Sequence, residues 1–161
     1  MKRFRPRSGG IELKLRGEEV DALDLMMPVL STVGSDDGDP AAERLSVAAY
    51  PEDREAQAEY GRLMDPELDK HRMMDRAVVA SSLEAARRGS VRLDPAEADS
   101  WLMVMNETRL VLAARLGIEE EGWGTAVGTR RRPQPEMALL VYLTEVQDDL
   151  IQALADQVPE G

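Results

Sequence analysis

Two hydrophobic periods follow each other along this chain, and they predict different elements. Over residues 11–15, apolar and charged positions alternate, which is the two-residue period of a half-buried strand. Two glycines separate this run from a short extended piece at residues 4–7, so the pattern predicts a β-hairpin within residues 1–16. Pro6 cannot donate a backbone hydrogen bond, which places the first strand at the edge of its sheet.

After the hairpin, apolar residues recur every three or four positions, and this spacing predicts a helical core over residues 17–117. Pro28 is expected to kink or break the first helix near Met27, because an interior proline removes a hydrogen bond and clashes with the preceding turn. Aspartate followed by proline suits a helix start, because aspartate caps the helix and proline is well tolerated at the first helical position, N1. Such pairs predict helix starts at three places: Asp39-Pro40, Asp65-Pro66 and Asp94-Pro95.

The helix expected after Asp94 has the strongest signals at both ends. Glu97 completes a capping box with Asp94, and Gly117 is expected to stop the helix. The apolar residues between these ends predict that it is the most buried helix. A short extended piece at residues 91–93 precedes it and is a candidate to pair with the hairpin.

The remaining chain divides into a loop and one more helix. Residues 118–135 show no periodicity, which predicts a long loop, and the apolar spacing beyond them predicts a C-terminal helix over residues 136–158. A length of 161 residues suits one domain. The sequence therefore predicts a mainly α protein, a single-domain helical bundle over residues 1–161 with a short N-terminal β-hairpin.

The charge is unevenly distributed, and this bears on the class of partner. The formal net charge is −11, yet residues 1–16 hold six basic groups and one acidic group. Residues 17–69 hold three basic and fifteen acidic groups, and residues 133–161 hold six acids and no base. A nucleic-acid-binding domain usually has a basic surface. We therefore expect any DNA contact to be weak or indirect.

Two basic clusters are candidates for a partner contact. Arg3, Arg5 and Arg7 alternate along the predicted strand, so they are expected to share one face. The segment Arg130-Arg131-Arg132 lies on the predicted long loop. Compensation of the acidic body by these arginines is the alternative interpretation. Arg109 lies within an apolar helix, and if it is partly buried it needs a carboxylate or carbonyl partner.

The residue types that most enzymes and metal sites use are scarce. There is no cysteine, and the single histidine, His71, lies in a charged helical segment and is expected to face solvent. The sequence contains no glycine-rich nucleotide-binding motif and no nucleophile elbow. We expect no catalytic residue, cofactor or metal. Nine methionines at helical spacing are expected to lie mainly in the core. No apolar run is long enough to span a membrane, so a cytoplasmic protein is expected.

Several segments together resemble one known family. They are Phe4-Arg-x-x-x-Gly-Gly, Arg44-Leu45 with Ala49-Tyr50-Pro51, Glu59-Tyr60, and Trp101-Leu-x-x-x-Asn106-x-x-Arg109-Leu-x-Leu-x-x-Arg115-Leu-Gly117-Ile. Over nearly the whole chain, this pattern resembles the AosR-like family of actinobacteria, and the segment from Trp101 is its most specific part. The resemblance implies a transcriptional regulator of the oxidative stress response. In that family, redox sensing is assigned to a Cys-x-x-x-Cys pair, which this chain lacks.

The sequence and the resemblance together favour a non-enzymatic cytoplasmic regulator without a cysteine redox switch. It is expected to act through protein–protein contacts, with a sigma factor or other transcription machinery as the implied partner. Asn106, Arg109 and Arg115 join the hairpin arginines as candidate partner-binding residues. A structural or adaptor module, acting as a homodimer with no direct transcriptional role, stays open as the alternative.

Overall fold

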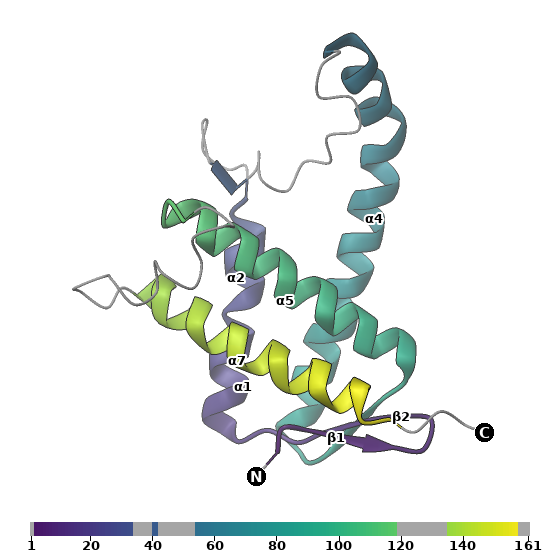
Figure 1. Ribbon diagram of the computed structural model, residues 1–161, viewed down its shortest axis with the longest axis vertical. Coiled ribbons are helices and arrows are strands. Elements are labelled where there is room, and N and C mark those ends of the chain that lie inside the picture. Colours follow the sequence, from purple (N-terminus) through teal and green to yellow (C-terminus); the bar gives the residue numbers. More distant parts are fainter. Residues whose placement is uncertain (1, 34–39, 42–53, 119–134, 158–161) are drawn as a thin grey trace.

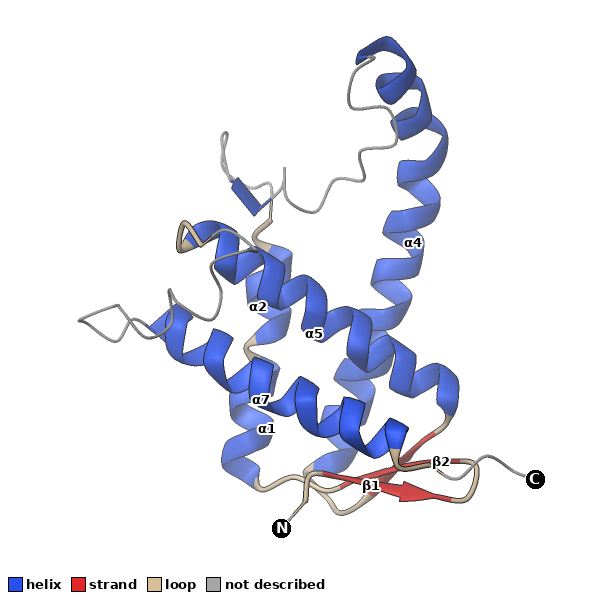
Figure 2. Cartoon of the chain, in the orientation of Figure 1, coloured by secondary structure: helices blue, strands red, loops and turns tan. Residues whose placement is uncertain are grey.

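The computed structural model describes residues 2–33, 40–41, 54–118 and 135–157, with the side chains of residues 54–66 outside that description. It is mainly α-helical with a small antiparallel sheet next to the N-terminus, which confirms the predicted fold class (Figure 1, Figure 2). Nearly all of the predicted loop over residues 118–135, including the Arg130-Arg131-Arg132 segment, lies outside the described residues, as does Asp39 of the first Asp-Pro pair.

The predicted hairpin consists of β1 (Phe4–Arg7) and β2 (Gly10–Leu13). A third strand, β3 (Val91–Leu93), pairs with β2, so the predicted pairing of this segment with the hairpin is confirmed. The order β1-β2-β3 leaves β1 at the edge, where Pro6 interrupts no ladder. Gly10 permits the close pairing, because a Cβ at this position would lie 2.4 Å from the carbonyl oxygen of Leu93.

The chain breaks between α1 (Gly17–Asp24) and α2 (Met26–Ser31), slightly before the predicted break near Met27. The position follows from the proline ring of Pro28, which clashes with the carbonyl four residues earlier, at Asp24. Pro28 itself falls in the first turn of α2. Backbone N–H groups have no partner inside the helix there, so the missing donor costs little.

Helix α4 (Arg54–Ala86) continues through the second Asp-Pro pair, so the predicted helix start at Asp65 is wrong. A proline inside a helix removes one hydrogen bond and costs about 3 kcal/mol, and this penalty is confined to one turn. The helical residues on both sides keep the helix continuous. The upper part of α4 extends beyond the other helices, and its C-terminal half packs against α5 (Pro95–Arg115) (Figure 1).

Helix α5 (Pro95–Arg115) begins and ends as its sequence predicts. The carboxylate of Asp94 accepts a hydrogen bond from the backbone N–H of Glu97 at 2.8 Å, and the backbone N–H of Asp94 donates to the carboxylate of Glu97 at 3.1 Å. At the other end, Gly117 has a φ of +73°, and the backbone N–H of Ile118 donates to the carbonyl of Ala113 at 2.8 Å. This is a Schellman motif, in which the residue after the helix adopts a left-handed backbone conformation that favours glycine.

Helix α7 (Pro135–Ala155) is the predicted C-terminal helix and ends three residues before its predicted end. It runs antiparallel to α5: α5 begins beside the sheet, whereas α7 ends there, with Gln157 donating to the carbonyl of Gly10 at 2.8 Å. None of the described helices is both long and apolar enough to cross a membrane.

The core lies between the sheet and the helices, and Trp101 on α5 is its largest fully buried side chain. The ring of Phe4 on β1 meets Trp101 edge to face, with centroids 6.0 Å apart, and so fastens the hairpin to α5. Methionines divide between two environments. Met26, Met105 and Met137 are buried as expected, whereas the expectation is wrong for three exposed ones: Met73, Met74 and Met103.

Two glycine substitutions test the sheet. Gly10→Ala should lower the free energy of unfolding by about 1–3 kcal/mol, because the added methyl group would force β2 and β3 apart. Gly17→Ala is the control: it has open space and lies in α1, where alanine is the better helix former, so stability should stay equal or rise. Urea unfolding measures both, and equal effects of the two variants would contradict the tight β2–β3 pairing.

Candidate functional site

The hairpin places the three N-terminal arginines in different surroundings. Arg3 is largely buried, with 18 % of its side chain exposed, and contacts residues of α1 and α7. Arg5 lies opposite Glu12 in the register of β1 and β2. Arg7 is more exposed and donates from Nε to the same Glu12 carboxylate at 3.0 Å. The hairpin therefore offers Arg5 and Arg7 near its surface, while Arg3 faces carboxylates within the fold.

Arg3 is the centre of a cluster that joins three elements. Its Nε lies 2.5 Å from Oε2 of Glu19 on α1, and its Nη1 lies 2.5 Å from Oδ2 of Asp149 on α7. Oε1 of a third carboxylate, Glu145, lies 3.8 Å from Nη2 of Arg3. The guanidinium of Arg3 lies over the ring of Tyr142, 5.4 Å from the ring centroid. The cluster thus holds the hairpin, α1 and α7 together.

The pKa values of the Arg3 cluster reflect competition between burial and pairing. Burial alone would lower the pKa of Arg3, but hydrogen bonds to Glu19 and Asp149 outweigh it and raise the pKa. Burial alone would raise the pKa of Glu19, but hydrogen bonds from the Arg16 backbone and from Arg3 lower it below its ordinary value. Tyr142 has its pKa raised to about 12, chiefly by burial. These charged states stabilise one another, which is typical of a structural cluster.

A second charged cluster joins α4 to α5. Glu107 is buried, with 7 % of its side chain exposed, and lies 3.5 Å from the guanidinium groups of both Arg72 and Arg76. Burial raises the pKa of Glu107, and the charges of the two arginines oppose this rise. About two turns earlier on α5, the hydroxyl of Ser100 donates to Asp75 of α4 at 2.8 Å. These polar contacts set how α4 lies on α5.

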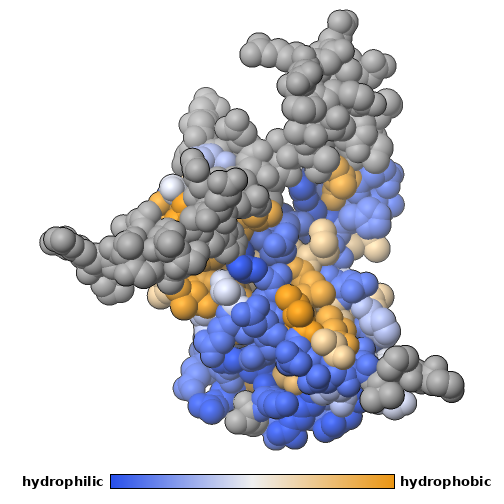
Figure 3. Space-filling view, in the orientation of Figure 1, coloured by the Kyte–Doolittle hydropathy of each residue, from blue (hydrophilic) through white to orange (hydrophobic). Residues whose placement is uncertain are grey.

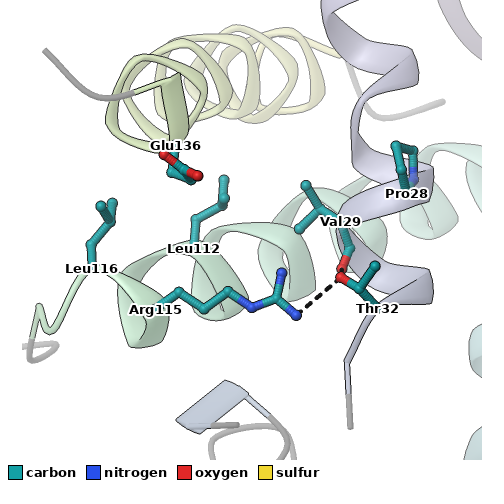
Figure 4. Close-up of a pocket in the computed structure, with 7 residues that line it drawn as sticks. All are labelled: Pro28, Val29, Thr32, Leu112, Arg115, Leu116 and Glu136. Atoms are coloured by element: carbon teal, nitrogen blue, oxygen red, sulfur yellow. Dashed lines mark hydrogen bonds between the residues drawn. The ribbon is translucent and has the colours of Figure 1, made fainter. Parts of the chain in front are cut away.

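Arg115 occupies the far end of α5, beside a cavity of about 570 Å³. Its Nη2 donates to the hydroxyl of Thr32, at the end of α2, at 3.1 Å (Figure 4). The cavity is otherwise mostly apolar at this junction of α2, α5 and α7. Its lining residues are Pro28, Val29, Thr32, Leu112, Arg115, Leu116 and Glu136.

Asn106 and Arg109 lie on α5 away from this cavity, and Arg109 contacts α7. Asn106 is exposed. Arg109 is half-buried and donates from Nη1 to the side-chain carbonyl of Gln147, which is the kind of partner that its sequence position predicted. Burial lowers the pKa of Arg109, and the charge of Asp148 opposes this effect.

Large apolar side chains surround Asn106 and Arg109 on the outer side of both helices. Met103 on α5 and Ile151 on α7 are each 50 % exposed. On α5, Met103, Asn106 and Leu110 share one side at helical spacing, and on α7, Ile151 follows Gln147 by one turn. Figure 3 shows hydrophobic surface over the middle of α5 and the C-terminal half of α7. We call this surface the α5–α7 face; its residues are Leu102, Met103, Asn106, Arg109, Leu110, Asp148, Ile151 and Leu154.

The six candidate residues therefore fall into three places. Asn106 and Arg109 meet on the α5–α7 face, Arg115 lies beside the cavity, and the hairpin arginines lie near the sheet. Sequence reasoning missed the partners of Arg3, because Asp149 is separated from it by 146 residues. It also missed Met103 and Ile151, because an apolar residue at helical spacing gives no sign of which side the fold leaves exposed.

Comparison with known proteins identifies a family but no activity. The sequence model described as "Domain of unknown function (DUF2017)" matches residues 1–154, and the chain belongs to this family. No curated protein and no solved structure matches the chain significantly.

The Arg3 cluster leads to a prediction about stability and pH. Arg3→Gln should lower the free energy of unfolding at neutral pH by about 2 kcal/mol, because Glu19 and Asp149 lose their charged partner. Because the pKa of Glu19 is lowered in the folded state, its carboxylate stabilises the fold fully above about pH 4.5. This stabilisation is lost as the pH falls through the folded-state pKa. The difference in free energy of unfolding between the variant and the natural chain, measured by urea unfolding, should therefore shrink below pH 4.5.

The matched control is Arg7→Gln, which removes a more exposed ion pair on the same hairpin, with 46 % of the Arg7 side chain exposed. It should change stability by less than about 1 kcal/mol. If both variants lose the same amount, or if the Arg3→Gln effect is constant with pH, the assigned role of the cluster is wrong.

Proposed function

Because membership of DUF2017 assigns no activity, we propose that the protein is a non-enzymatic regulator that binds another protein through the α5–α7 face. The partner that the resemblance to the AosR-like family implies is a component of the transcription machinery, such as a sigma factor. The proposal includes no cysteine redox switch, because the chain has no cysteine. The exposed apolar side chains around Asn106 and Arg109 are the observation that carries it.

Helix α5 carries apolar residues on all of its sides. A helix with apolar residues on one side has its polar side in water, whereas a helix with apolar residues all round is normally buried. Helix α5 is of the second kind, yet Met103 is half exposed and Leu102 and Leu110 are only partly buried. A surface apolar residue on its own is ordinary, but a contiguous group rimmed by polar residues is typical of a protein interface.

The energetic gain supports binding. Full burial of a methionine or isoleucine side chain stabilises by about 1.5–3 kcal/mol relative to exposure, so covering half-exposed Met103 and Ile151 contributes about 1 kcal/mol each. Asn106 and Arg109 supply polar groups at the same place, and arginine is enriched at interface centres. The other large charged clusters, around Arg3 and Glu107, connect elements within the chain.

Site-specific photo-crosslinking tests this function. A photoreactive amino acid replaces Met103 in the protein inside its native cells, and the crosslinked species are identified by mass spectrometry. We expect an adduct with a transcription component. The control replaces Met74, which is 57 % exposed on α4 and lies outside the α5–α7 face. Equal adducts at both positions, or adducts without any transcription component, would contradict the proposal.

A further inference from the structure

We propose that the α5–α7 face binds a basic amphipathic helix of its partner. This inference rests on the proposed function and adds the chemistry of the partner segment. It depends on three features of the described residues: the arrangement of the two helices, the apolar side chains along them, and the acidic groups beside those side chains.

The arrangement favours a helix as the bound element. Antiparallel α5 and α7 lie side by side, with Arg109 and Gln147 in contact across them (Figure 1). Side chains in rows on two neighbouring helices form ridges, against which a third helix can pack its own ridges. An amphipathic helix that contacts such a surface presents apolar residues every three or four positions. Met103 and Leu110 on one helix and Ile151 and Leu154 on the other provide matching contacts.

The charges beside the apolar side chains favour a basic helix. Asp99, one turn before Met103 on α5, and Asp148, one turn before Ile151 on α7, are both exposed. Residues 133–161 carry six acidic groups and no basic one, but Glu145 and Asp149 already pair with Arg3, so the acidic charge beside the apolar side chains comes from Asp99 and Asp148. The cation of this face, Arg109, is already close to Gln147 and to the charge of Asp148. A bound helix with lysine or arginine along its flanks would therefore meet opposite charge.

The same charges oppose a second copy of this chain as the occupant. A two-fold dimer places the same surface of both copies together. Through this face, both copies would bring Asp99 and Asp148 to one interface, and each chain has a net charge of −11. Like charges held close together at an interface are destabilising, so a different protein with a basic segment fits better.

Fluorescence anisotropy with labelled peptides tests the inference on the purified full chain. The probe is a peptide of leucine and lysine in which leucine recurs every three or four residues. Two control peptides accompany it: one with the same composition in shuffled order, and one with glutamate in place of lysine. We expect the amphipathic leucine–lysine peptide to bind at least about tenfold more tightly than either control.

Variants locate the binding. Met103→Ser with Ile151→Ser should weaken binding of the leucine–lysine peptide about tenfold, because both half-exposed side chains lose their apolar contact. Met74→Ser on α4 is the matched control and should leave affinity within about twofold. Circular dichroism melting of each variant confirms that these surface substitutions leave the fold intact.

Charge variants test the acidic groups separately. Asp99→Asn with Asp148→Asn should weaken binding about threefold or more and reduce its salt dependence. The control, Glu67→Gln with Asp69→Asn, removes the same charge from exposed positions on α4 and should have a smaller effect. Equal effects of the two pairs would show that only the overall charge matters and would overturn the inference.

The remaining outcomes separate this inference from the proposed function. If the glutamate or shuffled peptide binds as tightly as the leucine–lysine helix, or if no peptide binds, the basic amphipathic helix is wrong. A crosslink from Met103 to a transcription component would still support the proposed function in that case. A concentration-dependent dimer that the Met103 and Ile151 substitutions abolish would identify a second copy as the occupant and overturn the inference.

Discussion

Helix α5 packs against α2, α4, α7 and the strands β2 and β3, and the burial of its apolar side chains holds these elements together. Trp101 lies at the centre of this arrangement, fully buried and in contact with Phe4 of the hairpin. Phe4 is the single phenylalanine of the chain, so this part of the core is packed by an aromatic pair, whereas aliphatic residues pack the core elsewhere. The capping box and the Schellman motif set the ends of α5, and the other elements are positioned relative to it.

Helix α5 is mostly buried, but part of its apolar surface is exposed. Apolar residues lie on all its sides, and the described elements cover it except along the row that includes Met103 and Leu110. Ion pairs fasten the neighbouring elements to the body: Glu107 connects α5 to α4, and Arg3 connects the hairpin to α1 and α7. These clusters keep the packing around α5 in one arrangement, which gives the α5–α7 face a defined shape.

Local signals predicted the elements whose ends depend on neighbouring residues. The hairpin and both ends of α5 agree with the sequence pattern, because caps and turns involve groups within a few residues of each other. The predicted pairing of β3 is also confirmed, although it joins β3 to β2 across a long stretch of chain. Asp65-Pro66 shows the limit of this reasoning. The same pair of residue types starts α5 at Asp94 but lies inside α4, since a local penalty of about 3 kcal/mol is outweighed by the helical residues on both sides of it.

The sequence alone therefore determined the fold class, the hairpin, the ends of α5 and the acidic character of the α7 region. Of the α5–α7 face, the sequence pointed to two residues in advance: Arg109 by its position on an apolar helix, and Asn106 by its place in the segment that carries the family resemblance. Only the tertiary structure placed Arg3 among Glu19 and Asp149, set Arg115 beside Thr32, and left Met103 and Ile151 half exposed. These outcomes depend on residues far apart in the chain. A spacing of three or four residues defines the sides of a helix, but the packing of other elements decides which side is exposed.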